Sequence, residues 1–461
     1  MFTTGNPKFY FLKSPGILFF FNFIFIFIAI KLAPSFYGDL IFDYDSENYI
    51  SSPENRLSIY PFILDIFGEK NFKNLINFQI LFFSLSVAYL VQKVIKKLKL
   101  FFTIIFLLTI LLNFFYLSFC KVILTEGFFF SLVNFILALF FDLDDKKKNK
   151  TSLLISLCCG ALISIRPEGI ILGTVFFCFI FIIHKIALKF FLINLSFFLI
   201  FPLLENFIYY QKYDERKSVF NYIVAGKLYM ISSSERFKFS DFSEFNNNFL
   251  EEVVKSSRDV QNFVKNFKNP YLKSNLITDY EAISQYELHK MINLEKQEID
   301  KNLDNLTLKT YLNIIFKYPF EYLNITFHHY LTMCTPGGRI FFLENEAKKK
   351  NLEIPYNQSF KNLSGNIALE RLNKNLIFVT IFTLIFMFFY FLMTINSLFK
   401  ILKKREISLI NLIIIAAQIH LISVSFLNIG SVRYVMPVYS IITLSTLVYF
   451  KNFFYNLRHE K

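Results

Sequence analysis

Long uncharged hydrophobic runs alternate with short polar connections along most of the chain. Several of these runs approach the roughly 20 residues that an α-helix needs to cross a bilayer. They are 14–36, 74–92, 100–119, 122–141, 151–166, 168–184, 188–210, 375–399, 407–429 and 434–452. The pattern predicts an all-α polytopic membrane protein with about ten transmembrane helices. We expect the first run to be retained as a helix, since no small-residue cleavage site follows it.

One long polar segment, residues 211–374, interrupts the hydrophobic pattern. Within it, apolar residues recur with the spacing of one helix face. The clearest example is FLEEVVKSSRDVQNFVKNF, with Leu250, Val253, Val254, Val260, Phe263, Val264 and Phe267. We therefore predict three parts: an N-terminal transmembrane module of about seven helices (1–210), a helical insert (211–374) and a C-terminal transmembrane module of about three helices (375–461).

The stretch 311–334 is apolar enough to be considered as a further spanning helix. Spanning would bury Lys317 and Glu321 in hydrocarbon, at a cost of roughly 2.5–3.5 kcal/mol each near the bilayer centre. It would also invert the orientation of all the helices that follow. We therefore predict a helix that lies at the membrane interface, with a break at Pro319.

The composition agrees with a membrane protein, since 54% of the residues are hydrophobic and the mean hydropathy is +0.44. The formal charge is +14, but excess lysine in a membrane protein reports topology more often than nucleic-acid binding, so we expect no nucleic-acid partner. Five scattered cysteines without a C-x-x-C pair argue against a disulfide framework and a zinc site. Adjacent His328 and His329 diverge in direction on a helix, which disfavours a metal-binding pair.

The distribution of Lys and Arg among the connections predicts the orientation. With the N-terminus inside, the inside segments hold 19 of these residues and the short outside segments hold 7. This bias predicts a plasma (inner) membrane protein whose N- and C-termini are cytoplasmic. Loop 36–61 and the insert 211–374 then face the extracytoplasmic side.

Loop 36–61 carries the densest group of candidate functional residues. These are Asp39, Asp43, Asp45, Glu47, Glu54, Tyr49, Arg56 and Tyr60. Carboxylates held beside a membrane helix are costly unless they serve a purpose. We therefore expect this loop to form one wall of an active site, although each acid taken alone is also explained as a solvated loop residue.

Four further signals fall on the same predicted face. They are Thr125-Glu126, Arg166-Pro167-Glu168-Gly169, Pro336-Gly337-Gly338-Arg339 and Arg433-Tyr434-x-x-Pro437. Glu126 is an isolated charge within a long hydrophobic stretch, which makes it a functional candidate. Arg166 and Arg433 are also explained as membrane anchors, and the glycine pair as a simple turn.

The order of these signals resembles the GT-C superfamily of membrane glycosyltransferases, which includes the protein mannosyltransferases and the lipid A aminoarabinose transferases. In such enzymes an acidic residue of the first outer loop is followed by a Tyr, then by a Pro-containing segment that enters a short interfacial helix. Asp45, Tyr49 and segment 56–61 look like this arrangement, with Asp43 as a competitor for the acidic position. The Thr-Glu pair, the Arg-Pro turn and the late Arg-Tyr pair are also similar. The resemblance covers roughly 1–210 and the last two helices, and the insert matches no family pattern.

This resemblance implies a GT-C-like arrangement of helices and an inverting glycosyltransferase. The donor would be a polyprenyl-phosphate-linked sugar, and the acceptor an extracytoplasmic glycolipid, polysaccharide or protein. The acceptor hydroxyl must lose a proton to a nearby carboxylate, for which we expect Asp45, with Glu126 positioning it or the acceptor. Arginine suits the leaving lipid phosphate because its guanidinium forms charge-assisted, two-point hydrogen bonds to phosphate oxygens. The predicted substrate-binding residues are Arg56, Tyr60, Arg166, Arg433 and Tyr434. Metal use is open, because the loop carboxylates would also suit Mg²⁺ or Mn²⁺.

Two other functions stay open at this point. A membrane polysaccharide polymerase or ligase is also rich in outer-face arginine and carries a large outer loop, but it does not need the early acidic loop. A transporter or lipid flippase usually places ionisable residues near the midplane and shows internal repeats, and the sequence shows neither. We therefore favour the glycosyltransferase.

Overall fold

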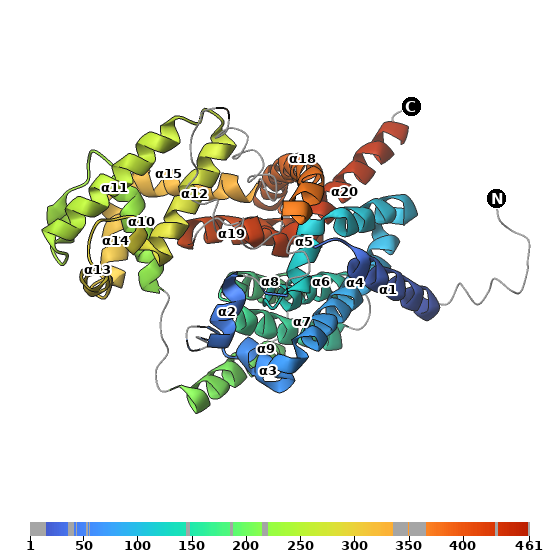
Figure 1. Ribbon diagram of the computed structural model, residues 1–461. Helices are drawn as coiled ribbons and strands as arrows, with labels where there is room; N and C mark the ends of the chain where they lie inside the picture. The colour runs from blue at the N-terminus through green and yellow to red at the C-terminus, as the bar shows by residue number, and fades with distance from the viewer. Residues whose placement is uncertain are drawn as a thin grey trace, which may run out of the picture. The chain divides into compact units, whose positions relative to one another are not determined.

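The computed structural model describes residues 15–35, 41–42, 44–51, 54, 56–143, 148–184, 188–213, 220–334, 349, 366–428 and 432–459. In these residues the secondary structure is entirely helical (Figure 1). The chain forms two compact units. Unit 1 holds Met1–Glu215, Asn362–Ile419 and Met436–Lys461, and unit 2 holds Arg216–Lys361 and His420–Val435.

Unit 1 contains most of the hydrophobic helices. They are α1 (Pro15–Leu32), α2 (Tyr44–Ser51), α3 (Ile59–Phe67), η4 (Glu69–Asn71), α4 (Phe72–Leu112), α5 (Phe114–Ser118), η5 (Phe119–Lys121), α6 (Glu126–Leu143), α7 (Lys148–Ile165), α8 (Gly169–His184), α9 (Leu188–Lys212), α18 (Asn366–Lys404) and α20 (Met436–His459). The long helix α4 is broken at Lys99, whose φ of 67° lies in the left-handed region. The break follows the lysine-rich interval that the sequence places between two hydrophobic runs.

Helix α6 forms the centre of unit 1. It packs against α4 on one side and α7 on another, and nearly all of its residues are buried. Helix α7 packs in turn against α8 and α9. The close approach of α7 to α9 requires glycine at position 160, because a Cβ there would lie 2.1 Å from the carbonyl oxygen of Phe198. Helix α20 also contacts α4 and α6, so most of the predicted C-terminal module shares one unit with the N-terminal module, whereas its segment 420–435 belongs to unit 2.

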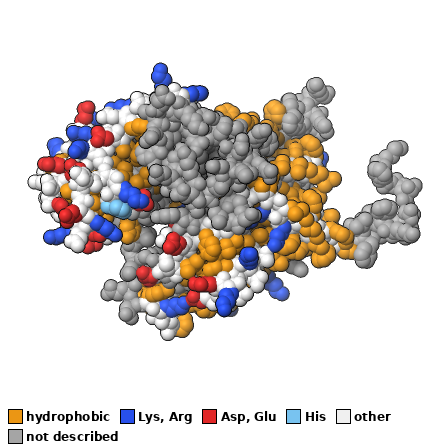
Figure 2. Space-filling model, in the orientation of Figure 1, with side chains coloured by type: hydrophobic (Ala, Val, Ile, Leu, Met, Phe, Trp, Pro, Cys, Tyr) orange, Lys and Arg blue, Asp and Glu red, His pale blue; other side chains and the backbone are white. Residues whose placement is uncertain are grey.

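Several helices are long and apolar enough to cross a membrane. Among the described residues these are Glu126–Leu143, Leu188–Lys212, Ile381–Lys404 and Leu409–Leu427, with a fifth if Glu69–Leu112 and Phe114–Lys121, bent by 58°, form one broken span. Three shorter apolar helices are Gly16–Leu32, Asn149–Ile165 and Gly169–Ile182. These four or five helices support a polytopic membrane protein, while about ten spans and their orientation stay predictions. Figure 2 shows hydrophobic side chains gathered on the part of unit 1 around α1.

Unit 2 is a helical domain with its own hydrophobic core. Its helices are α10 (Phe220–Ser232), η6 (Phe239–Phe242), α11 (Asn247–Lys265), α12 (Pro270–Tyr286), η7 (Leu288–Lys290), α13 (Lys296–Leu303), α14 (Leu308–Lys317), α15 (Pro319–Met333) and η8 (Val432–Tyr434). Helix α19 (Leu409–Leu427) begins in unit 1 and ends in unit 2. In α11 the predicted apolar face is buried at Leu250, Val253, Val254 and Val264.

The stretch 311–334 forms parts of two helices instead of one. Helix α14 starts after Thr307, whose side chain accepts a hydrogen bond from the backbone of Thr310, and it ends at Lys317. Helix α15 begins with Pro319 in its first turn, a position where the missing N–H is harmless. The structure thus places a break at Pro319, as the sequence predicts.

Three buried ionisable side chains meet inside unit 2. The Glu281 carboxylate lies 2.8 Å from the Lys227 ammonium and 2.8 Å from Nε2 of His329. Burial opposes ionisation of Glu281, but the charges of His329 and Lys227 outweigh it and hold the pKa of the carboxyl below its usual range. Lys227 and His329 also lie 3.3 and 3.1 Å from the carbonyl oxygens of Asn428 and Ser425. This charged cluster therefore ties segment 420–435 to the insert.

Candidate functional site

The start of α6 is held in place by the buried segment that precedes it. The backbone N–H of Ile123 donates to the carbonyl of Ile41 at 2.8 Å, and the Ser46 hydroxyl donates to the Ile123 carbonyl at 2.8 Å. The Gln79 amide of α4 donates to the Val122 carbonyl at 2.9 Å. These bonds satisfy backbone groups that would otherwise be costly to bury. They also fix Thr125 and Glu126, the next residues of the chain.

Glu126 and Arg166 form a buried ion pair between α6 and the turn after α7. The side chains are 1% and 8% exposed. Glu126 is the first residue of its helix, where the positive end of the helix dipole favours a carboxylate. The Arg166 Nε also contacts Glu168 at 3.1 Å, and its Nη1 donates to the Thr125 hydroxyl at 3.4 Å. One guanidinium is thus placed between two carboxylates.

The local sequence explains the position of Arg166. The turn between α7 and α8 is closed by a hydrogen bond from the Gly169 N–H to the Arg166 carbonyl at 2.9 Å. A Cβ at Gly169 would lie 2.0 Å from the carbonyl oxygen of Leu162, so only glycine allows this tight turn. The guanidinium also lies 5.8 Å from the ring centre of Phe129 in α6, a contact that favours a cation.

Two tyrosines extend the site toward α2 and α3. The Tyr49 hydroxyl is 3.3 Å from that of Thr125, and its ring packs edge-on against Tyr60 with centres 5.1 Å apart. Tyr60 is 1% exposed and donates to the Gln79 side chain at 2.9 Å. Burial raises the pKa of both phenols, with Arg166 opposing the shift at Tyr49. Both hydroxyls therefore stay protonated at neutral pH.

Asp45 and Arg56 form the more exposed end of the same arrangement. Their side chains are 3.2 Å apart and are 18% and 27% exposed. The Arg56 guanidinium lies 4.9 Å from the ring centre of Tyr49. We call the connected set the polar network; it consists of Asp45, Tyr49, Arg56, Thr125, Glu126, Arg166 and Glu168. It runs from the partly exposed surface of α2 into the hydrophobic interior of unit 1.

Helix α9 contributes a further buried acid that the sequence reasoning missed. Glu205 is 4% exposed and accepts a hydrogen bond from the Ser58 backbone N–H at 3.0 Å. The Ser58 hydroxyl donates to the Glu205 carbonyl at 2.7 Å, and Tyr209 donates to the Glu54 carbonyl at 2.9 Å. Glu205 anchors the loop that carries Arg56. An isolated charge inside the hydrophobic run 188–210 was the signal available in the sequence.

The structure brings together five of the predicted site residues. Asp45, Arg56, Glu126 and Arg166 belong to the polar network, and Tyr60 supports it through Tyr49. Asp39, Asp43 and the segment 336–339 lie outside the described residues.

Arg433 and Tyr434 belong to unit 2. The Arg433 guanidinium lies 5.5 Å from the ring centre of Tyr434. The Tyr434 carbonyl is 3.1 Å from Nε2 of His420, and its hydroxyl accepts from Asn428 at 3.2 Å. These contacts fix the segment that carries Arg433, and its predicted phosphate-binding role stays a prediction.

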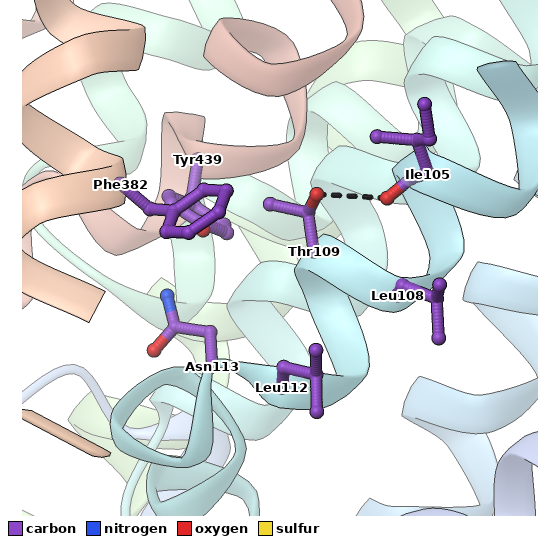
Figure 3. A pocket seen from close by; sticks show the side chains of 7 residues that line it. All are labelled: Ile105, Leu108, Thr109, Leu112, Asn113, Phe382 and Tyr439. Atoms are coloured by element: carbon purple, nitrogen blue, oxygen red, sulfur yellow. Dashed lines mark hydrogen bonds between the residues drawn. The ribbon is translucent and has the colours of Figure 1, made fainter. Parts of the chain in front are cut away.

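An apolar cavity of about 200 Å³ lies between α4, α18 and α20 (Figure 3). It is lined by Ile105, Leu108, Thr109, Leu112, Asn113, Phe382 and Tyr439. The Thr109 hydroxyl donates to the Ile105 carbonyl at 2.7 Å, which leaves mostly hydrocarbon at the surface of the cavity. Tyr116 stands between this region and α6, with its ring 5.6 Å from Tyr439 and 4.8 Å from Phe130.

Within the described part of the chain, no group of three or more His, Cys, Asp and Glu side chains is arranged to hold a metal ion. The two adjacent histidines point to different partners, because His328 contacts Ser274 and His329 contacts Glu281. No protein-family model matches the chain, and neither the curated proteins nor the solved structures include a match to it.

Proposed function

We propose that the protein is an integral membrane glycosyltransferase of the GT-C type. It transfers a sugar from a polyprenyl-phosphate-linked donor to an extracytoplasmic glycan, lipid or protein acceptor, with inversion. The observation that carries the proposal is the polar network. Three motifs that are far apart in the sequence, and whose order resembles that superfamily, converge on the start of α6 in an otherwise hydrophobic unit.

The exposed end of the network suits proton transfer. Asp45 is the most accessible carboxylate in the set, and the Arg56 guanidinium holds it in position. A carboxylate within hydrogen-bond reach of the acceptor hydroxyl takes up the proton that this hydroxyl loses as it attacks the sugar. The Tyr49 ring in turn orients Arg56. We assign Asp45 as the general base on this basis.

The buried end of the polar network suits a role in holding other side chains of the site in place. Arg166 is compensated by two carboxylates, which disfavours a further anionic ligand at the same guanidinium. We therefore assign Arg166 to holding Glu126 and Thr125, which position Tyr49, instead of the phosphate contact that the sequence suggested. The predicted phosphate ligands are then Arg56 and Arg433, with Tyr434 beside the latter.

The lipid part of the donor needs apolar surroundings. The cavity lined by α4, α18 and α20 supports the proposal because its lining is almost entirely hydrocarbon.

A polysaccharide polymerase or ligase is the second candidate, since it also acts on lipid-linked sugars. The polar network favours the transferase because it is built around the acidic loop, which a polymerase does not need.

The donor class separates the two candidates. The purified protein is reconstituted in vesicles with radiolabelled sugars carried either on polyprenyl phosphate or, as oligosaccharides, on polyprenyl diphosphate. The proposal predicts release of polyprenyl phosphate with single-sugar transfer from the first donor class. Turnover confined to the diphosphate-linked oligosaccharides would identify a polymerase or ligase and would overturn the proposal.

A further inference from the structure

Unit 2 carries a row of large apolar side chains that its own hydrophobic core leaves exposed. We call this row the apolar ridge; it consists of Leu308, Leu312, Phe316, Phe320, Leu323 and Phe327. Their exposed fractions range from 41% to 75%. Single exposed hydrophobic residues are common on proteins, but a contiguous set of this size marks an interaction surface.

The ridge follows from the way α14 and α15 pack. Their inner faces bury Tyr311, Ile314, Tyr322 and Ile325 in the core of unit 2. The ridge residues recur every three or four positions, so they lie on the opposite face of each helix. The junction is fixed by Tyr318, whose hydroxyl donates to Asp241 at 2.8 Å. Both outer faces are therefore mostly apolar, with the exposed Asn324 as a polar residue on the face of α15, and the ridge residues do not belong to the hydrophobic core of unit 2.

The charged residues of α14 and α15 are also unevenly distributed, with lysines exposed and few acidic residues. Within α14 and α15, which the structure describes completely, Glu321 is the one acidic residue, and it accepts a hydrogen bond from Ser234 at 2.9 Å. The basic residues Lys309 and Lys317 are exposed beside the ridge, and the Lys317 ammonium is paired with the Asp241 carboxylate at 2.6 Å. Lysines beside an apolar helix face match the anionic headgroups at a bilayer surface.

Helix α11 of the same unit has a different outer face. Its exposed residues include Glu251, Lys255, Arg258 and Asp259, so charges of both signs face solvent there. The side of unit 2 visible in Figure 2 likewise carries acidic and basic side chains over α11 and α13. Among the described residues of unit 2, the outer faces of α14 and α15 are therefore mostly apolar, whereas the outer face of α11 carries charges of both signs.

We propose that the apolar ridge inserts into the headgroup region of the lipid bilayer and rests unit 2 on the membrane surface. A lipid surface is favoured over a protein partner because the same chain contains several helices of membrane length, so a bilayer is always within reach. The flanking lysines and the absence of exposed acids along α14 and α15 fit an anionic lipid surface. The proposal does not depend on the proposed enzymatic activity.

Because the chain contains no tryptophan, the fluorescence of a single introduced tryptophan reports only on the surroundings of that position. Phe316→Trp and Phe320→Trp each place one fluorophore on the ridge with a conservative change at an exposed position. Lys255→Trp on α11 is the matched control. Each full-length variant is reconstituted in vesicles of phosphatidylcholine and phosphatidylglycerol, with and without lipids brominated on the upper acyl chain. Quenching by bromolipid and by aqueous acrylamide is then measured.

The ridge variants are expected to show strong bromolipid quenching, weak acrylamide quenching and blue-shifted emission. The control is expected to show the reverse. Strong acrylamide quenching at positions 316 and 320 would overturn the proposal, because the ridge would then face water. Protection from both quenchers would also overturn it, since the ridge would then be covered by protein, either elsewhere in this chain or in a second copy. Circular dichroism of each variant confirms that the helices are intact.

Discussion

The most specific energetic prediction concerns Arg166, which is shared between two carboxylates. In Arg166→Gln, the Glu126 and Glu168 side chains lose their common cation while remaining at most 10% exposed. Breaking a buried ion pair by removing one partner costs about 3–5 kcal/mol, and here two carboxylates are left without that partner. We therefore expect a loss at the upper end of this range. In Glu126→Gln, Arg166 keeps Glu168, so the expected loss is only about 1–3 kcal/mol.

The double variant Arg166→Gln/Glu126→Gln sharpens this prediction. It leaves one buried carboxylate instead of two, so it should be more stable than Arg166→Gln alone. Each protein is purified in mixed micelles and unfolded with dodecyl sulfate while the helical circular dichroism signal is followed, which gives the relative free energy of unfolding. Equal losses for the two single variants, or strictly additive losses in the double variant, would refute the shared guanidinium.

Three shorter predictions concern unit 2. Glu281→Gln should lower the free energy of unfolding by about 3–5 kcal/mol in the same assay, because Lys227 and His329 lose their buried partner. The control Glu251→Gln, which changes an exposed carboxylate of α11, should change it little. Burial, together with nearby positive charges, lowers the pKa of His328 to about 4. On acidification the unfolded chain therefore protonates this histidine at a higher pH than the folded protein does, so the free energy of unfolding should fall as the pH drops from 6.5 to about 4. His328→Asn should flatten this pH dependence. Arg433→Lys should weaken donor use nearly as much as Arg433→Ala if a two-point phosphate contact is required, and full activity of the lysine variant would reduce Arg433 to an anchor.

The sequence predicts most of the hydrophobic helices because hydrocarbon-compatible runs are long and have charged ends. The same logic singled out Glu126 and Arg166, since a charge beside a membrane helix is conspicuous. The break at Pro319 was predictable because proline cannot continue the backbone ladder of a helix. The number of spans is less accessible, because a run such as 151–166 forms a helix shorter than the bilayer thickness.

Contacts between residues that are far apart in the chain could not be predicted from the sequence. The contact of Ser58 with Glu205 joins positions far apart in the chain, and it depends on how α9 packs beside α3. The two-carboxylate environment of Arg166 likewise emerges only when α6 and the α7–α8 turn meet. Segment 420–435 belongs to unit 2, where Lys227 and His329 contact the backbone carbonyls of Asn428 and Ser425, and these contacts have no periodic signal in the sequence.

Sugar transfer by vesicles that contain wild-type protein, Asp45→Asn or Glu47→Gln shows whether Asp45 is the general base of a glycosyltransferase. Asp45→Asn keeps the shape of the side chain and removes the proton acceptor, whereas Glu47→Gln changes an exposed acid on the same short helix. We expect Asp45→Asn to lose roughly 10²–10⁴-fold in turnover with polyprenyl-phosphate-linked sugar, while donor binding and the Glu47→Gln rate stay close to wild type. Equal rates for Asp45→Asn and the wild type, or no transfer by the wild type from any polyprenyl-phosphate-linked sugar, would contradict this expectation.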